Sequence, residues 1–276
     1  MPSPLLMGSV AHERAVLGIK RATAKVLVNR VTGRIAGALL RNRINSHGLC
    51  VKTQSPLIRP EVKALLALGM YESAERRLVI GHLRHDLPVV ELGASIGYIS
   101  GLISRRRPPR QIAVEANPAL IQLIEELLKS NDARNVQVLH GAIDYEKRMS
   151  ARFVRSSFNT GGTILSTASS SNAASVDVPT VTLGGVIERE QIGPFALVCD
   201  IEGAEHGMIM HEDPAVIQAC QQMIIELHAG TYTGRNYSVL DLVKMIQEQW
   251  HMEAIKRDGS NWVFQRHGDS EAAANS

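Results

Sequence analysis

Three ionisable side chains follow two apolar runs of the chain, and their types could move a proton. Asp200 comes directly after the run Phe195–Cys199, and Glu226 and His228 end the run that begins at Met223. A carboxylate or imidazole at the end of a strand can take a proton from a substrate hydroxyl. Asp200 and Glu226 could instead hold a divalent cation that lowers the pKa of that hydroxyl. We therefore expect a base at Asp200 or His228, with Glu226 orienting its neighbour.

A glycine turn between a predicted strand and a predicted helix offers a place for a cofactor. An apolar run through Leu92 leads into Gly93 and Gly97, and a helix-compatible stretch begins at Tyr98. Without a β-carbon, the glycines let a ligand lie against the main chain, and the helix start presents unpaired N–H groups. The turn lacks the G-x-G-x-x-G of nicotinamide and flavin enzymes. Its pattern is acidic-x-Gly-x-x-x-Gly, which is typical of S-adenosylmethionine (SAM) dependent methyltransferases. The predicted contacts here are Glu91, Gly93, Ala94, Ser95 and Gly97.

Two further segments extend the predicted cofactor site. The strand Gln111–Glu115 ends in an acid about twenty residues after Gly97, where its carboxylate can accept both hydroxyls of a ribose. Asn117 caps the next helix, and small residues follow the third strand, leaving room for an adenine ring. The predicted contacts are Glu115, Ala116, Asn117, Gly141, Ala142, Ile143 and the carboxylate of Asp200.

Strands and helices alternate along the chain, which predicts an α/β fold. We expect a Rossmann-like, seven-stranded, mostly parallel sheet with one antiparallel edge strand. Runs at 252–255 and 261–265 flank Asp258-Gly259 and predict a hairpin at the sheet edge. Carboxyl ends of parallel strands meet at one rim, so Glu91, Glu115 and Asp200 should gather there.

The motifs as a set resemble one family. They are Glu91-Leu92-Gly93-Ala94-Ser95-Ile96-Gly97, Glu115-Ala116-Asn117-Pro118, Asp200-Ile201-Glu202-Gly203-Ala204-Glu205 and Gly69-Met70-Tyr71-Glu72. This set is similar to the FkbM family of SAM-dependent methyltransferases, over roughly residues 48 to 265. The resemblance implies a class I methyltransferase fold, SAM as cofactor and O-methylation of sugar or polyketide hydroxyls.

Four residues are candidates for substrate contact: Tyr71, Glu72, Glu202 and Glu205. Two of them have a plainer interpretation. Glu72 could simply complement the positive end of a helix dipole, and Glu205 could be an acid in the first turn of a helix. The sequence leaves these alternatives open.

The chain outside the motifs divides into an extension, a loop and a tail. Residues 1–47 form a basic helical N-terminal extension, which we expect to break near Gly33 and Gly37. It could meet an anionic membrane, a glycan or nucleic acid, but its apolar residues are spread too evenly for a clean membrane face, which favours a solvated helical extension. The methyltransferase domain spans 48–266, and 267–276 should be disordered. The composition of the Ser-rich stretch 155–175 predicts an irregular segment that is either a lid or a surface insertion.

Composition limits the remaining classes. A net charge of +3 over 276 residues is too small to imply nucleic acid by itself. Three cysteines at unrelated spacings favour a reducing compartment, and neither a signal peptide nor an 18-residue apolar window is apparent, so we expect a cytoplasmic protein. The leading hypothesis is SAM-dependent O-methylation of a hydroxyl on a sugar, glycan or natural product. An RNA or protein methyltransferase that uses the basic extension, and a non-catalytic SAM-binding module, are the alternatives.

Overall fold

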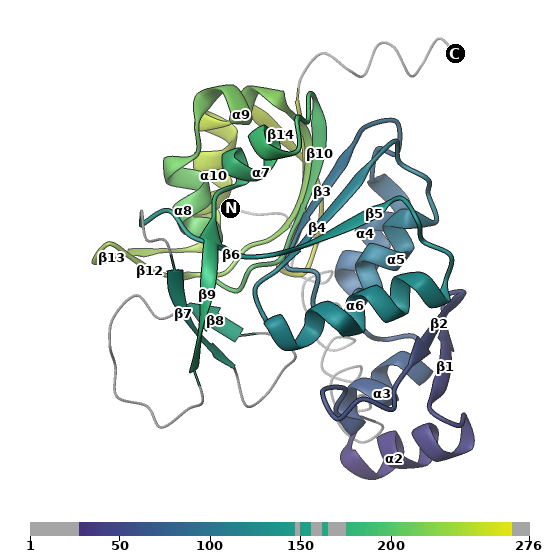
Figure 1. Ribbon diagram of the computed structural model, residues 1–276. Helices are drawn as coiled ribbons and strands as arrows, with labels where there is room; N and C mark the ends of the chain where they lie inside the picture. The colour runs from purple at the N-terminus through teal and green to yellow at the C-terminus, as the bar shows by residue number, and fades with distance from the viewer. Residues whose placement is uncertain (1–27, 147–149, 156–161, 165–174, 267–276) are drawn as a thin grey trace, which may run out of the picture. The chain divides into compact units, whose positions relative to one another are not determined.

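The computed structural model describes residues 28–146, 150–155, 162–164 and 175–266, and the chain divides after Tyr71 into two compact units (Figure 1). The described part of the first unit contains α2 (Arg30–Leu39), β1 (Arg43–Ser46), β2 (Leu49–Lys52) and α3 (Pro60–Ala67). Strands β1 and β2 form an antiparallel hairpin. The predicted membrane contact of the basic extension falls mainly on residues 1–27, which lie outside the described residues.

The predicted helix break near Gly33 and Gly37 is wrong, because α2 runs through both glycines. The side chain of Asn29 caps its first turn. A β-carbon at Gly33 would stand 1.7 Å from the carbonyl oxygen of Pro60, the first residue of α3. The glycine is therefore needed for the close approach of the two helices.

A seven-stranded sheet forms the centre of the second unit. Its strands are, in order across the sheet, β14 (Met252–Asp258), β15 (Asn261–Arg266), β11 (Cys220–Glu226), β10 (Phe195–Cys199), β3 (Val89–Leu92), β4 (Gln111–Glu115) and β5 (Val136–His140). Strands β11, β10, β3, β4 and β5 run parallel, and β15 runs antiparallel to both β11 and β14. The predicted Rossmann-like fold is confirmed, with the antiparallel strand next to the edge strand β14.

Helices cover both faces of this sheet (Figure 1). One face carries α4 (Ser73–His82), α5 (Tyr98–Ser104) and α6 (Pro118–Ser130), and the other carries α7 (Leu183–Arg189), α8 (Glu205–His211), α9 (Pro214–Ala219) and α10 (Val239–Gln249). Every residue of β3, β4 and β10 is buried, as expected for parallel strands covered on both sides. The predicted cap of α6 by Asn117 is confirmed, and Ser238 and Asp241 form a capping box on α10.

A four-stranded sheet lies between β5 and α7 in the chain. Its strands are, in order, β6 (Ala142–Ile143), β9 (Ser175–Val181), β7 (Ser150–Arg155) and β8 (Gly162–Ile164). We expected an irregular segment over 155–175, and for β8 that expectation is wrong because its backbone pairs with β7. Three residues are too few to show strand periodicity in a sequence. The rest of the predicted lid, 156–161 and 165–174, lies outside the described residues.

A short hairpin of β12 (Gly230–Tyr232) and β13 (Arg235–Tyr237) follows β11 and was not predicted. The predicted disordered tail, 267–276, lies outside the described residues. Among the helices that the structure describes, none has the length and apolar character needed to cross a membrane.

Candidate active site

The glycine turn after β3 meets the turn after β10 at the carboxyl edge of the sheet. Cys199 pairs with Leu92 in these neighbouring parallel strands, so Gly93 and Asp200 follow side by side. Gly93 has φ +92°, and a β-carbon there would stand 1.8 Å from the carbonyl oxygen of Asp200. We predicted that glycine makes room for a ligand, but the space is filled by the backbone of Asp200. The glycine thus sets how closely the two turns approach.

Gly97 also has a role inside the fold. It has φ +79° and comes directly before α5, and a β-carbon on it would stand 3.0 Å from Cγ2 of Ile124 on α6. Ala94 is buried and Ser95 takes a left-handed conformation with φ +51°. The predicted cofactor turn is therefore shaped by the packing of α5 and α6 around it.

Glu91 faces the interior of the protein. One of its carboxylate oxygens accepts a hydrogen bond from Ser100 Oγ at 2.9 Å, and the other accepts from Gln111 Nε2 at 3.3 Å. Burial raises the pKa of Glu91 to about 7. Glu91 thus ties β3 to α5 and β4 inside the fold, and its contact with the cofactor stays a prediction.

Glu115 has the features that a nucleoside site requires. Its two oxygens accept hydrogen bonds from the backbone N–H groups of Ser95 and Asn117, each at 2.7 Å. Burial raises its pKa to about 7, against the lowering effect of these N–H groups. Each oxygen of an ionised carboxylate has a further lone pair, so Glu115 can also accept both hydroxyls of a ribose. The residues present therefore fit the nucleoside part of SAM.

The other predicted cofactor residues surround Glu115. Asn117 accepts a hydrogen bond from the N–H of Ala119 at 3.1 Å, and Ala116 precedes it at the end of β4. The N–H of Gly141 donates to the carbonyl oxygen of Glu115 at 3.0 Å, which holds the end of β5 next to β4. Ala142 and Ile143 continue from there as β6, and both are buried. The structure thus holds Asn117 on the carboxylate of Glu115 and Gly141 on its backbone carbonyl.

Asp200, Glu226 and His228 come together as predicted. One oxygen or nitrogen from each lies within 4.8 Å of the others. Glu226 accepts a hydrogen bond from Ser260 Oγ at 2.5 Å, whereas Asp200 Oδ1 is buried with no hydrogen-bond partner among the described residues. Burial, followed by the charges of Glu226 and Glu202, raises the pKa of Asp200 to about 7. Asp200 therefore has an oxygen ready to accept a proton near neutral pH.

Glu205 orients His228, a role that we had given to Glu226. His228 donates to one carboxylate oxygen of Glu205 from Nδ1 at 2.7 Å and from its backbone N–H at 2.9 Å. The N–H of Gly203 donates to the other oxygen at 2.7 Å. Glu205 is fully buried, so it holds His228 in place of the predicted substrate contact. Its hydrogen bond raises the pKa of His228 to about 9.

The remaining predicted substrate contacts lie in different surroundings. Glu202 is exposed, with its carboxylate 3.8 Å from Nε2 of His228. Glu72 has φ +45° and precedes α4, and its side chain makes no capping hydrogen bond. Tyr71 is the last residue of the first unit and is buried, and its substrate contact stays a prediction.

Glu75 is a buried acid on α4 that we did not include among the site residues. Burial, together with the charges of nearby acids, raises its pKa well above the usual value.

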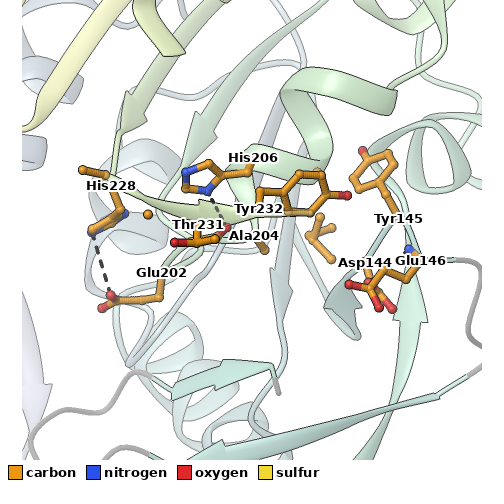
Figure 2. Close-up of a pocket in the computed structure, with 14 residues that line it drawn as sticks. Asp144, Tyr145, Glu146, Glu202, Ala204, His206, His228, Thr231 and Tyr232 are labelled. Atoms are coloured by element: carbon orange, nitrogen blue, oxygen red, sulfur yellow. Dashed lines mark hydrogen bonds and ion pairs between the residues drawn. The ribbon is translucent and has the colours of Figure 1, made fainter. Parts of the chain in front are cut away.

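A hollow of about 330 Å³ opens beside His228, which, with Asp200 and Glu226, forms what we call the catalytic group because of its predicted role (Figure 2). Its walls come from the segment after β6, the start of α8 and the stretch from His228 to Tyr232. His206 of α8 is part of the wall and is only 3% exposed. Sequence reasoning missed it because a single histidine in a short helix has no periodic pattern, and its place depends on the hairpin opposite.

A comparison with known families decides the class of this site. A model of the methyltransferase FkbM domain matches residues 91–251. The chain belongs to the FkbM methyltransferase family. The match includes Glu115, Asp200, Glu205 and His228, so this FkbM domain is a SAM-dependent methyltransferase domain. No curated protein matches the sequence.

Solved structures that resemble the FkbM chain include three bacterial proteins. An uncharacterized protein from Listeria monocytogenes serotype 4b has 10% identity and a TM-score of 0.42, with 70% of this chain and 67% of that chain covered. A precorrin-6y C5,15-methyltransferase from Geobacter metallireducens GS-15 has 14% identity and a TM-score of 0.39, covering 71% and 88%. A TehB-like SAM-dependent methyltransferase from Corynebacterium glutamicum has 13% identity and a TM-score of 0.37, covering 70% and 86%.

Proposed function

We propose that this chain is an O-methyltransferase that transfers the methyl group of SAM to a hydroxyl of a sugar, glycan or natural-product acceptor. The observation that carries the proposal is the buried Oδ1 of Asp200, which lies beside Glu226 and His228 and has no hydrogen-bond partner within the described part of the chain. An alcohol is a weak nucleophile while it keeps its proton, and the best base for it has a pKa near the working pH. Asp200, with a pKa raised to about 7, meets that requirement.

In this mechanism the carboxylate of Asp200 takes the proton of the acceptor hydroxyl while the hydroxyl oxygen attacks the methyl carbon. Bound SAM supplies a methyl group on a positively charged sulfur, which leaves as a neutral thioether. Glu205 keeps His228 protonated at neutral pH, because it raises the pKa of the imidazole to about 9. The imidazolium lies 3.8 Å from Glu202 and 3.9 Å from Glu226, and its charge offsets the repulsion among these acids.

The test is methyl transfer from labelled SAM to a panel of hexosides, amino sugars and natural-product alcohols. We expect Asp200→Asn to lower turnover by about 100-fold or more, the usual effect of losing a general base, while SAM affinity measured by calorimetry changes little. Activity of the unchanged enzyme should rise with pH through about 7, as Asp200 ionises. A rise centred near pH 9, lost in His228→Gln and kept in Asp200→Asn, would assign the base to His228 instead.

A divalent cation is a second way to activate the hydroxyl. Asp200, Glu226 and His228 offer two carboxylates and an imidazole, a ligand set that suits a first-row divalent metal. The hydrogen bond from His228 to Glu205 would fix Nε2 toward such an ion. If a cation is required, a chelator will abolish turnover and Mn²⁺ will restore it. If turnover is unchanged in the presence of the chelator, the hydroxyl is activated by proton transfer to a base without a cation.

The same assay separates the other classes. Label that enters RNA or protein, with binding that weakens steeply as salt rises, would favour a polymer acceptor. SAM binding without label transfer would indicate a non-catalytic module.

We also propose a cytoplasmic location. Cys50, Cys199 and Cys220 are all free thiols, which suits a reducing compartment.

A further inference from the structure

The hollow beside the catalytic group has two chemically different ends. Figure 2 shows His228 and Glu202 at one end, Asp144, Tyr145 and Glu146 at the other, and His206 and Tyr232 between them. Its volume of about 330 Å³ is near the lower end of the range for small-ligand sites. A compact molecule could therefore place a hydroxyl at the catalytic end and a second polar group at the far end.

His206 gives the middle of the hollow an unused polar atom. Its Nδ1 lies 2.8 Å from the carbonyl oxygen of Gly203, and because a carbonyl only accepts, Nδ1 must carry the proton. Nε2 has no hydrogen-bond partner among the described residues, although the side chain is only 3% exposed. A β-carbon on Gly230 would stand 3.6 Å from this nitrogen, so the glycine lies directly against the imidazole. A buried polar atom without a partner is costly, and a ligand hydroxyl or amine would satisfy it.

Acidic side chains line both ends of the hollow, and the protonated imidazole of His228 lies at one of them. Asp144 and Glu146 form the far end, Glu202 lies at the catalytic end, and the described residues that line the hollow include no lysine or arginine. Tyr232 lies in the field of the first two carboxylates: burial, and then the charges of Glu146 and Asp144, raise the pKa of its phenol. Its ring stacks on His206 at 6.2 Å between centroids. An aromatic face beside two carboxylates favours a cation.

We propose that the acceptor bound in this hollow is a compact, amine-bearing alcohol, with its ammonium group between Asp144 and Glu146 and the hydroxyl to be methylated at the end near His228. This inference rests on the proposed function and adds to it the class of acceptor. His206 Nε2 accepts a hydrogen bond from a second polar hydrogen of the ligand. Acceptors that carry a phosphate or carboxylate are repelled by the same charges.

The experiment measures binding to the enzyme saturated with S-adenosylhomocysteine, so that it does not depend on turnover. The probes are methyl α-glucosaminide, its N-acetyl derivative, methyl α-glucoside, methyl α-glucuronide and 2-deoxystreptamine. We expect at least one of the two amines to bind about tenfold or more tightly than the neutral glycosides and the uronide. N-acetylation should remove the advantage, because it removes the charge and keeps the ring, and added salt should reduce it.

Substitutions in the chain locate the effect. Glu146→Gln and Asp144→Asn should each reduce the preference for the amine several-fold without changing SAM affinity. Gly230→Ala, which places a methyl group beside Nε2 of His206, should weaken all the ring acceptors. Glu188→Gln removes an exposed carboxylate on α7 that does not line the hollow, and it should leave every affinity unchanged.

Two outcomes would overturn the inference. One is that neither amine binds more tightly than the neutral glycosides, and the other is that the preference survives both Glu146→Gln and Asp144→Asn. In either case, SAM binding and methyl transfer to a neutral alcohol would leave the proposed function standing. Loss of SAM binding in the unchanged protein would overturn the proposed function itself.

Discussion

At the scale of single residues, the partners of each carboxylate decide what it does. Glu91 lies in β3, Glu115 ends β4 and Asp200 follows β10, and burial raises the pKa of each to about 7. Glu91 bonds two side chains inside the fold, Glu115 bonds two backbone N–H groups, and Asp200 Oδ1 has no partner among the described residues. The same chemical group therefore fixes the fold at Glu91, and we propose that it binds ribose at Glu115 and accepts a proton at Asp200.

Glu91→Gln should flatten the pH dependence of stability. Because the pKa of Glu91 is raised from an ordinary 4.5 to about 7, the folded protein holds this proton more tightly than the unfolded chain. Its contribution is therefore full below about pH 4.5 and is lost as pH rises through about 7, a change of roughly 3 kcal/mol. Urea unfolding at pH 5, 6, 7 and 8 will show a smaller decline in the variant. Glu125→Gln, at an exposed site on α6, serves as the control, and equal declines in both variants would contradict the argument.

At the scale of elements, glycines mark where segments of the chain touch. Gly33 lets α2 meet the start of α3, and Gly93 lets the turn after β3 meet the turn after β10. Gly97 serves the packing of α6 against the start of α5. The spacing of glycines in the methyltransferase motif therefore reflects contact between elements as well as space for a ligand.

Alanine substitution at two glycines should have opposite effects. Gly93→Ala should destabilise the protein by about 3 kcal/mol or more, because φ is +92° and the new β-carbon would overlap the carbonyl oxygen of Asp200. Gly81→Ala, at an exposed position in α4 where a β-carbon meets nothing within 4 Å, should stabilise it by about 0.5–1 kcal/mol. Thermal and urea unfolding of both variants will measure this. Tolerance of alanine at 93 would mean that the two turns do not touch.

At the scale of the whole molecule, the described site lies in one of two compact units. Glu115, Asp200, His228 and the hollow all belong to the unit that begins at Glu72, whereas α2 and α3 belong to the unit that ends at Tyr71. A ligand stabilises the state to which it binds, and it suppresses local opening most strongly where it makes contacts. The effect of SAM should therefore be unequal along the chain.

Hydrogen exchange with and without SAM will measure that difference. We expect slower exchange at 93–97, 115–117 and 141–143, since the N–H groups of Ser95 and Asn117 already bond the carboxylate that would bind the ribose. Exchange in α2 and α3 should stay unchanged. Glu115→Ala should remove the protection by SAM. Protection spread equally over both units would show that binding acts on the chain as a whole.

The sequence by itself determined the order of elements and the type of site. Apolar runs, caps and glycine spacing are local features, and they were enough to predict β3, the turn after it, Glu115 and Asp200 with the correct fold. Tertiary structure decided the pairings. Glu205 and His228 are 23 residues apart and meet only because β10 and β11 are neighbours in the sheet. His206 lines the hollow because the hairpin after β11 lies opposite α8. Burial and charge depend on such long-range contacts, so no local pattern could have shown that Glu205 holds the histidine while Asp200 Oδ1 has no hydrogen-bond partner among the described residues.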